Sequence, residues 1–154
     1  MSDSINTSSN LMIVGWREWV ALPELGIEKI KAKIDTGART SALHAFHIET
    51  FQKDAKEHVR FKLHPFRHHK EIIKICTAEI IDKRMVKDSG GHAELRYVIR
   101  TSLVLGSQQW SIEITLTDRE SMYFRMLLGR SAMINRVMVS PENSYRVSKD
   151  LKKR

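Results

Sequence analysis

The stretch that decides the fold is Ile34-Asp35-Thr36-Gly37-Ala38, which ends a run of alternating apolar residues and lysines, residues 29–34 (KIKAKI). That period-two alternation predicts a strand with one buried and one wet face. The aspartate then stands where the strand breaks into a tight loop, so its carboxylate projects from the strand end. Gly37 permits backbone torsions and a close approach that a side chain would block, and the Thr36 hydroxyl can hold the loop rigid. Two such carboxylates about 3 Å apart share one proton, so that one activates water while the other protonates a substrate carbonyl.

The surroundings of this tripeptide decide how it is interpreted. Asp-Xaa-Gly alone is ordinary turn chemistry. Here it follows an alternating strand, and a second apolar-apolar-Gly element appears at Leu127-Leu128-Gly129-Arg130. The two elements together favour the chemistry of an aspartic protease over a simple turn.

The rest of the chain is mainly β in pattern. Residues 59–63, 96–105 and 110–116 alternate or are rich in β-branched and aromatic side chains, which predicts strands. Only residues 130–136 suggest a short helix. Many short strands with few helices predict an all-β barrel or sandwich.

Length and composition indicate one ordinary globular domain. The chain has 154 residues, 42% hydrophobic and 29% charged, with a net charge of +8. The polar residues 1–10 predict a disordered N-terminal arm, residues 11–147 a domain, and residues 148–154 a basic tail. Cys76 is the only cysteine, which excludes an internal disulfide. Without a signal peptide or a long apolar run, we expect a cytoplasmic protein and no membrane partner.

Four segments carry a resemblance to a known family. They are residues 16–23 (WREWVALP), 34–45 (IDTGARTSALHA), 116–119 (LTDR) and 126–130 (MLLGR). Over about residues 12–140 the chain resembles the bacterial retropepsin-like proteins, which are also labelled ATP-dependent zinc proteases or RimK-associated proteases. The resemblance implies a closed retropepsin-like (acid protease) β-barrel that hydrolyses peptides as a homodimer, each chain giving one Asp-Thr-Gly. It also implies a functional link to an ATP-grasp glutamate ligase.

The same resemblance implies roles for single residues. Asp35 would be catalytic, Thr36 would grip the partner chain of the dimer, and Gly37 would lie beside the substrate main chain. Ala38 stands where pepsin-like enzymes have Ser or Thr; without that hydroxyl on the ionised dyad, we expect activity nearer neutral pH. The element behind the catalytic loop would be Leu127, Leu128, Gly129 and Arg130.

Arg39 departs from the retroviral pattern. There, the residue four after the catalytic aspartate is acidic and pairs with the arginine of the Gly-Arg element. Arg39 and Arg130 cannot pair with each other. An arginine beside the cleft instead predicts affinity for carboxylates, and hence for an acidic peptide or protein tail.

Residues 84–92 (RMVKDSGGH) predict the tip of a hairpin, because glycines permit positive φ. In the family picture this hairpin is the flap that closes over substrate, which gives Ser89, Gly90 and Gly91 a substrate-binding role.

Asp88-Ser89-Gly90 could also be taken for a second catalytic motif. A two-lobed protease needs about twice this length, and Lys87 rather than an apolar strand end precedes Asp88, so we reject that interpretation.

We expect no metal or other cofactor. His-Glu-x-x-His and Cys-x-x-Cys are absent, and His44 and His47 would face opposite sides of a strand. No phosphate-binding Gly-x-x-x-x-Gly-Lys loop is present, so any ATP dependence would come through a partner.

Two alternatives to a protease stay open. One is a catalytically silent, dimeric peptide-binding module that kept the fold. The other, which we favour less, is a nucleic-acid-binding β-barrel, because residues 53–74 interleave Lys and Arg with Phe61 and Phe66. Asp54, Glu57 and Glu71 interrupt that basic run.

Overall fold

The computed structural model describes residues 11–88 and 90–149. The expected arm and most of the expected tail lie outside these residues. In chain order the elements are β1 (Met12–Gly15), β2 (Arg17–Leu22), the 3-10 turn η1 (Pro23–Leu25), β3 (Ile27–Ile34), β4 (Ser41–His44), β5 (Phe46–Lys53), β6 (Lys56–Leu63), β7 (Lys74–Glu79), β8 (Asp82–Lys87), β9 (Ala93–Leu105), β10 (Gln108–Thr117), β11 (Met126–Leu128), α2 (Arg130–Met133) and β12 (Val137–Ser140).

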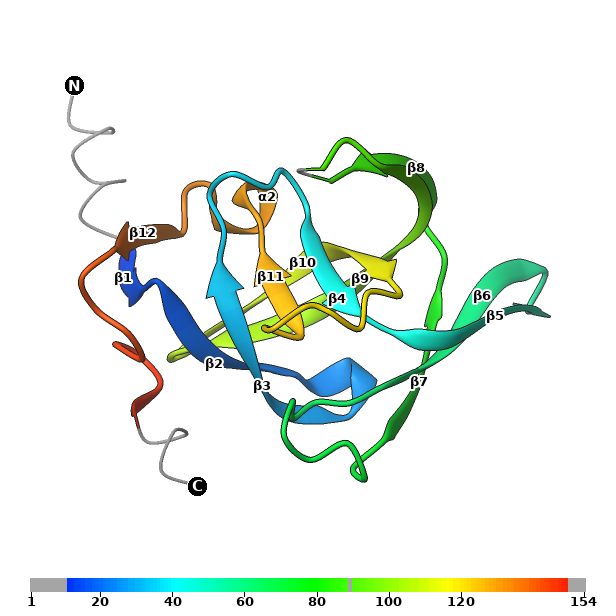
Figure 1. The fold of residues 1–154 in the computed structure, drawn as a ribbon, viewed down its shortest axis with the longest axis horizontal. Coiled ribbons are helices and arrows are strands. Elements are labelled where there is room, and N and C mark those ends of the chain that lie inside the picture. The colour runs from blue at the N-terminus through cyan, green and yellow to red at the C-terminus, as the bar shows by residue number, and fades with distance from the viewer. Residues whose placement is uncertain (1–10, 89, 150–154) are drawn as a thin grey trace.

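The main sheet closes on itself, which gives the all-β, ring-like architecture expected of a retropepsin-like chain (Figure 1). Its strands follow the order β10, β4, β11, β3, β2 and β9, and β9 pairs back onto β10. β8 adds to the outer part of β9 as an antiparallel hairpin. A separate sheet of β5, β6 and β7 flanks the ring.

The alternation of β3 sorts its side chains as predicted. Ile30, Ala32 and Ile34 are buried, while Lys33 is exposed. Each fully buried Leu or Ile contributes about 1.5–3 kcal/mol of transfer free energy. The largest fully buried side chains of the interior are Leu22, Ile27, Ile30, Leu43, Phe61, Leu63, Ile99, Leu103, Leu105, Ile114, Met126 and Leu128.

β11 lies between β3 and β4, the two strands that the Asp35 loop connects. It runs parallel to β3, with Leu128 beside Ile34, and antiparallel to β4. The loop from β3 to β4 must therefore cross the end of β11. This topology brings two segments more than 90 residues apart to one place.

The helix after β11 is shorter than predicted and ends at Met133 rather than at residue 136. Ile134 already has an extended ψ of 129°, and Asn135 adopts a left-handed φ of 64°. Asparagine tolerates this conformation better than most residues, so it turns the chain into β12.

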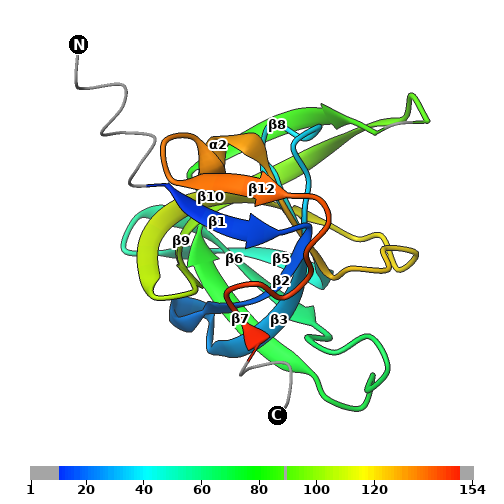
Figure 2. The same ribbon diagram turned by 90° about the vertical axis from the view of Figure 1, so that its left-hand side faces the viewer.

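β1 and β12 form a small parallel sheet that joins the two ends of the described chain (Figure 2). The fully buried carboxylate of Glu18 fixes this region. It accepts backbone N–H groups of Gly15 at 2.7 Å and Arg146 at 2.8 Å, and the Ser148 hydroxyl at 2.7 Å. A buried carboxylate with so many donors orders the last part of the chain.

Two side chains of the flanking sheet are buried. Phe61 has no exposed surface, so it cannot stack on a nucleic-acid base. Phe66, the other aromatic residue of the nucleic-acid-binding alternative, is only half-buried, so that alternative stays untested. Burial raises the pKa of the Cys76 thiol to about 11, and the thiol donates to the Leu25 carbonyl at 3.3 Å. Cys76 is therefore a packing residue rather than a nucleophile.

None of the helices in the described part of the chain has the length and apolarity to cross a membrane.

Candidate active site

Asp35 is the first residue after β3, and the end of β11 fixes its backbone. Its N–H donates to the Leu128 carbonyl at 2.9 Å, while its own carbonyl accepts the Ala38 N–H at 3.2 Å. The carboxylate Oδ1 accepts the Gly37 N–H at 3.0 Å. The side chain is half-buried, so the loop holds the carboxylate in a defined orientation with one side open.

Gly37 is required by proximity rather than by an unusual backbone angle. Its φ lies outside the left-handed region, but an added Cβ would stand 3.2 Å from Asp35 Oδ1. Any side chain there would crowd the carboxylate and obstruct access to it. The close approach of a substrate main chain to Gly37 stays a prediction.

The Thr36 hydroxyl does not hold the loop within the chain. The residue is exposed, and among the described residues no hydrogen bond to its side chain is found. Instead the guanidinium of Arg130 donates to the Thr36 carbonyl at 2.9 Å. Because position 39 is an arginine, Arg130 lacks the acidic partner expected from the retroviral pattern, and it anchors the Asp35 loop through a backbone oxygen instead.

Gly129 lets the chain pass directly under this loop. A Cβ at Gly129 would lie 2.6 Å from the Thr40 carbonyl carbon and 2.9 Å from the Ser41 nitrogen. The Gly129 N–H donates to the Ser41 hydroxyl at 3.0 Å, and the Arg130 N–H to the Ala38 carbonyl at 2.8 Å. Loop and crossing strand therefore form one rigid unit.

A cleft of about 910 Å³ opens in front of Asp35. Its floor includes Ala38, Thr115 and Leu127, and β8 with residues 84–88 lines the side opposite the loop. The β8–β9 hairpin, at the upper right of Figure 1, thus lines the cleft through residues 84–88.

The charged side chains of the cleft are mostly basic. Arg84 is held by Asp82 at 2.7 Å and Glu113 at 3.0 Å, and Arg96 by Glu94 at 2.6 Å. Three further bases that line the cleft are exposed and form no ion pair within the described chain: Arg39, Lys87 and Arg119.

The hairpin tip is a tight turn between Lys87 and Ala93. Asp88 Oδ1 accepts the His92 N–H at 2.9 Å, and that hydrogen bond is the main reason why the pKa of Asp88 lies below its ordinary value. Gly91 has a φ of 86°, which confirms the predicted use of glycine. Ser89 lies outside the described residues, and Gly90 is exposed beside Asp88.

A polar cluster behind the site was not predicted from the sequence. His44 is fully buried; its Nδ1 accepts the Arg119 N–H at 3.1 Å, so Nε2 carries the proton and donates to Glu120 at 2.9 Å. Burial and, second, the Arg125 charge lower the pKa of His44, although Glu120 raises it. A hydrogen bond from Lys70 is the main cause that lowers the pKa of Glu120 to about 2. Arg119 and Glu120 follow His44 by 75 and 76 residues, so no local pattern reveals these contacts.

The described residues offer no obvious metal centre, since nowhere among them do three or more His, Cys, Asp or Glu side chains gather. His44 has both ring nitrogens engaged. The Asp35 carboxylate with its loop donors is suited to acid–base chemistry on a bound substrate.

Comparison with known proteins gives relatives of two kinds. Proteins of Desulfotalea psychrophila and Shewanella pealeana named probable alpha-L-glutamate ligase are 50% identical over 129 residues and 46% identical over 138 residues. These matches cover 84% and 90% of this chain but only 28% and 30% of the relatives. The chain therefore spans less than a third of those relatives.

A solved structure supports the fold. A Legionella pneumophila protein of unknown function superposes with a TM-score of 0.74 at 29% identity, over 88% of this chain and 97% of that one. The family model described as RimB-like, retropepsin-like aspartic endopeptidase RimB, matches residues 13–150. With the Asp-Thr-Gly loop, the crossing strand and the closed ring of strands in place, the chain belongs to the RimB-like family of retropepsin-like proteins.

Proposed function

We propose that this chain is an aspartic endopeptidase whose active site forms when two copies each contribute one Asp35. The observation that carries the proposal is the Asp35 carboxylate, fixed by the Gly37 N–H and by the crossing strand and facing a cleft of about 910 Å³. One chain supplies one such carboxylate, and the chemistry needs two that share a proton.

In the mechanism, the ionised carboxylate takes a proton from water, and that water attacks the substrate carbonyl carbon. The protonated carboxylate of the other copy gives its proton to the carbonyl oxygen. Collapse of the tetrahedral intermediate breaks the C–N bond as a carboxyl group returns a proton to the leaving nitrogen. The Gly37 backbone lies where the substrate main chain passes, and the hairpin with Gly90 and Gly91 covers it.

The substrate we propose is an acidic peptide or protein tail. The unpaired bases Arg39, Lys87 and Arg119 line the cleft, and carboxylates are their natural partners. Two relatives carry the name of a glutamate ligase, which supports a glutamate-rich chain as the substrate and such a ligase as the functional partner. We also expect the optimum near neutral pH, because Ala38 provides no hydroxyl to the dyad; an optimum below about pH 4 would contradict this.

The test is hydrolysis of an oligoglutamate-tailed peptide by the wild type and by Asp35→Asn. The amide keeps the shape but cannot act as a base, so we expect loss of about 10³-fold or more in kcat. Asp54→Asn, at the exposed β5–β6 turn, is the matched control and should be fully active. Turnover that survives Asp35→Asn would reject the mechanism.

The same experiment separates the catalytically silent alternative. If the wild type binds the peptide without cleaving it, and Asp35→Asn binds equally well, the chain is a peptide-binding module.

A further inference from the structure

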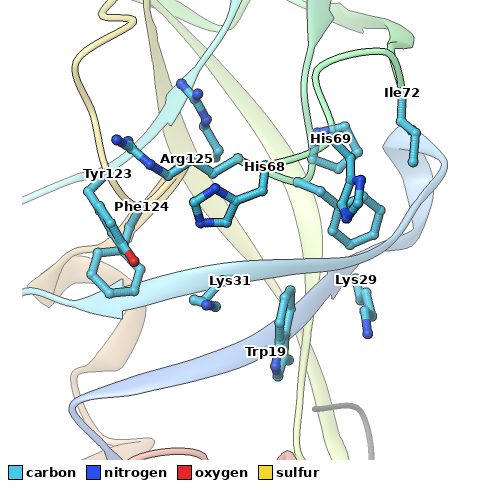
Figure 3. A pocket seen from close by; sticks show the side chains of 12 residues that line it. Trp19, Lys29, Lys31, His68, His69, Ile72, Tyr123, Phe124 and Arg125 are labelled. Atoms are coloured by element: carbon cyan, nitrogen blue, oxygen red, sulfur yellow. The ribbon is translucent and has the colours of Figure 1, made fainter. Parts of the chain in front are cut away.

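A second cavity, of about 390 Å³, lies away from the cleft and shares no lining residue with it. Strands β2 and β3 form its base, and the loops of residues 65–72 and 123–125 form its walls (Figure 3). Lys70 joins the two loops through Glu120 at 3.0 Å. We refer to it as the basic aromatic cavity.

The charges of the basic aromatic cavity all have one sign. Every described lining residue that can be charged near neutral pH is a base: two lysines, two arginines and two histidines. The nearby carboxylates of Glu71 and Glu120 are taken by His69 and Lys70 and do not line the cavity. A concave site whose charges are all positive attracts an anion.

Two residues that line the basic aromatic cavity each have a buried N–H group without a partner in the described chain. Arg125 is 3% exposed, and its Nε has no hydrogen-bond partner within the described chain. The indole N–H of Trp19 is in the same situation. The terminal nitrogens of Arg125 donate to the backbone carbonyl and the carboxylate of Glu120, each at 3.4 Å. Both nitrogen atoms have almost no accessible surface, so an anion in the cavity would meet the charge of Arg125 rather than these N–H groups.

Aromatic rings face the same space from two sides. Tyr123 and Phe124 lie together on one wall, edge to face at 5.2 Å, and Tyr123 is 53% exposed. Trp19 lies on the base between the side chains of Lys29 and Lys31 (Figure 3). Their ammonium groups are 4.6 Å and 5.2 Å from the centre of its ring, so Trp19 holds two cations toward the cavity.

The combination identifies the ligand class. Bases alone would accept any anion, but an aromatic side chain as exposed as Tyr123 favours an anion that also carries a flat ring. A volume of about 390 Å³ is at the small end for ligand sites and suits a single nucleotide better than a folded partner.

We propose that the basic aromatic cavity binds a nucleoside phosphate. The base stacks on Tyr123, and the phosphates lie among Lys31, Arg67 and His68, with Arg125 beneath. The Arg67 guanidinium lies over one face of the Tyr123 ring, 4.4 Å from its centre, so in this proposal Arg67 meets the phosphates while the base takes the other face of the ring.

The experiment is calorimetric titration of the full chain with ATP and GTP, and in parallel with adenosine, inorganic triphosphate and an oligoglutamate peptide. We expect the nucleotides to bind and to lose affinity as salt is raised. Tyr123→Ala should weaken binding about fivefold or more, because stacking of a base is worth roughly 1–3 kcal/mol. Lys31→Ala should weaken it about as much and reduce the salt dependence. Both side chains reach the surface, so the variants should fold.

Two controls locate the binding. Lys33→Ala removes an exposed lysine two residues further along β3 that does not line the cavity, and it should bind as the wild type does. Arg39→Ala should also leave nucleotide affinity unchanged; if it does not, the nucleotide binds in the cleft and the proposal fails independently of the protease.

The other probes define which results would overturn the proposal that the cavity binds a nucleoside phosphate. Equal affinity for inorganic triphosphate and ATP would mean a phosphate site without base recognition. Tighter binding of oligoglutamate that is sensitive to Lys31→Ala would make the cavity a docking site for acidic chains. No heat of binding at millimolar nucleotide would reject the site altogether.

Discussion

Arg39 and Arg130 show how two arginines in one loop region can take separate roles. The guanidinium of Arg130 donates a hydrogen bond to the Thr36 carbonyl at 2.9 Å. Arg39, in contrast, is exposed at the cleft and forms no ion pair in the described chain. The first is a positioning residue under our proposal, and the second meets the substrate.

Arg39→Ala is therefore expected to change substrate preference rather than general activity. For an oligoglutamate-tailed peptide kcat/KM should fall about tenfold, the loss expected of a charge-assisted hydrogen bond, while a neutral peptide should be cleaved as before. The measurement is competition between the two peptides in one reaction. A fall shared equally by both substrates would contradict a carboxylate-binding role.

His44 predicts a specific pH dependence of stability. Its pKa is lowered in the folded state from 6.5, so below about pH 6.5 the unfolded chain binds a proton that the native chain does not. The free energy of unfolding should then decrease as the pH falls from 6.5 to the native pKa of His44, by at most about 1.4 kcal/mol for each pH unit. Urea denaturation at pH 7.5, 6.5 and 5.5 measures it.

His44→Gln should flatten this slope, and His47→Gln, an exposed histidine three residues away, is the matched control. Glu120 does not contribute to this slope. Its pKa is about 2 in the folded chain and 4.5 in the unfolded chain, so its effect on the free energy of unfolding appears only under more acidic conditions. Equal slopes for wild type and His44→Gln would show that another group titrates.

Among the elements, β11 has the largest consequences for the site, although it is only Met126–Leu128. It supports Asp35 through the Leu128 carbonyl and continues through Gly129 into the residue that anchors Thr36. Its pairing with both β3 and β4 could not be predicted, because alternation identifies strands but not their neighbours. The Leu-Leu-Gly-Arg pattern signalled its importance only through the family resemblance.

Arg130→Met should lower kcat by up to about tenfold with little effect on KM or on stability, because it releases one hydrogen bond of the catalytic loop. Arg130→Lys should restore part of kcat, since an ammonium can reach the same carbonyl. Steady-state kinetics with thermal denaturation of each variant checks this. A variant as unstable as it is inactive would point to a structural role alone.

The β8–β9 hairpin gives a second prediction about an element. Asp88→Ala removes the acceptor that closes the tip turn onto the His92 N–H, so the proposed flap should order less well over substrate. We expect kcat/KM to fall about two- to tenfold, in line with one hydrogen bond of roughly 0.5–1.5 kcal/mol. Asp82→Ala, at the base of the same hairpin and outside the cleft lining, should affect kcat/KM less. An equal fall in both would assign the effect to the strand rather than the tip.

For the molecule as a whole, the sequence predicted the strands, because their pattern is local, and it missed the contacts between segments that are far apart in the chain. Alternation predicted the strands around residues 29–34, 59–63, 96–105 and 110–116, and the structure has strands at each. Glu18 was missed because its donors, Arg146 and Ser148, lie about 130 residues away. The basic aromatic cavity was missed for the same reason, since three separate segments build it.

Dimerisation is the last property that we predict, because the structure describes a single chain. The loop with Asp35 and the start of α2 are hydrogen-bonded neighbours, and exposed Ile134 follows α2 while Ile13 and Met138 pair on the terminal sheet. These exposed apolar side chains, after α2 and on the terminal sheet, are suited to contact a second copy. If two chains share one active site, Asp35→Asn chains must inactivate wild-type chains by forming mixed dimers.

With a ninefold excess of Asp35→Asn allowed to exchange, random pairing leaves about one tenth of wild-type chains in active pairs, so activity should fall to about one tenth. The same excess of active Asp54→Asn should raise it instead. The measurement is peptide hydrolysis at fixed wild-type concentration, after incubation long enough for exchange, with sedimentation at the same concentrations to show the dimer. Activity untouched by the inactive chain, at concentrations where subunits are seen to exchange, would mean that each chain works alone and that the paired-carboxylate mechanism is wrong.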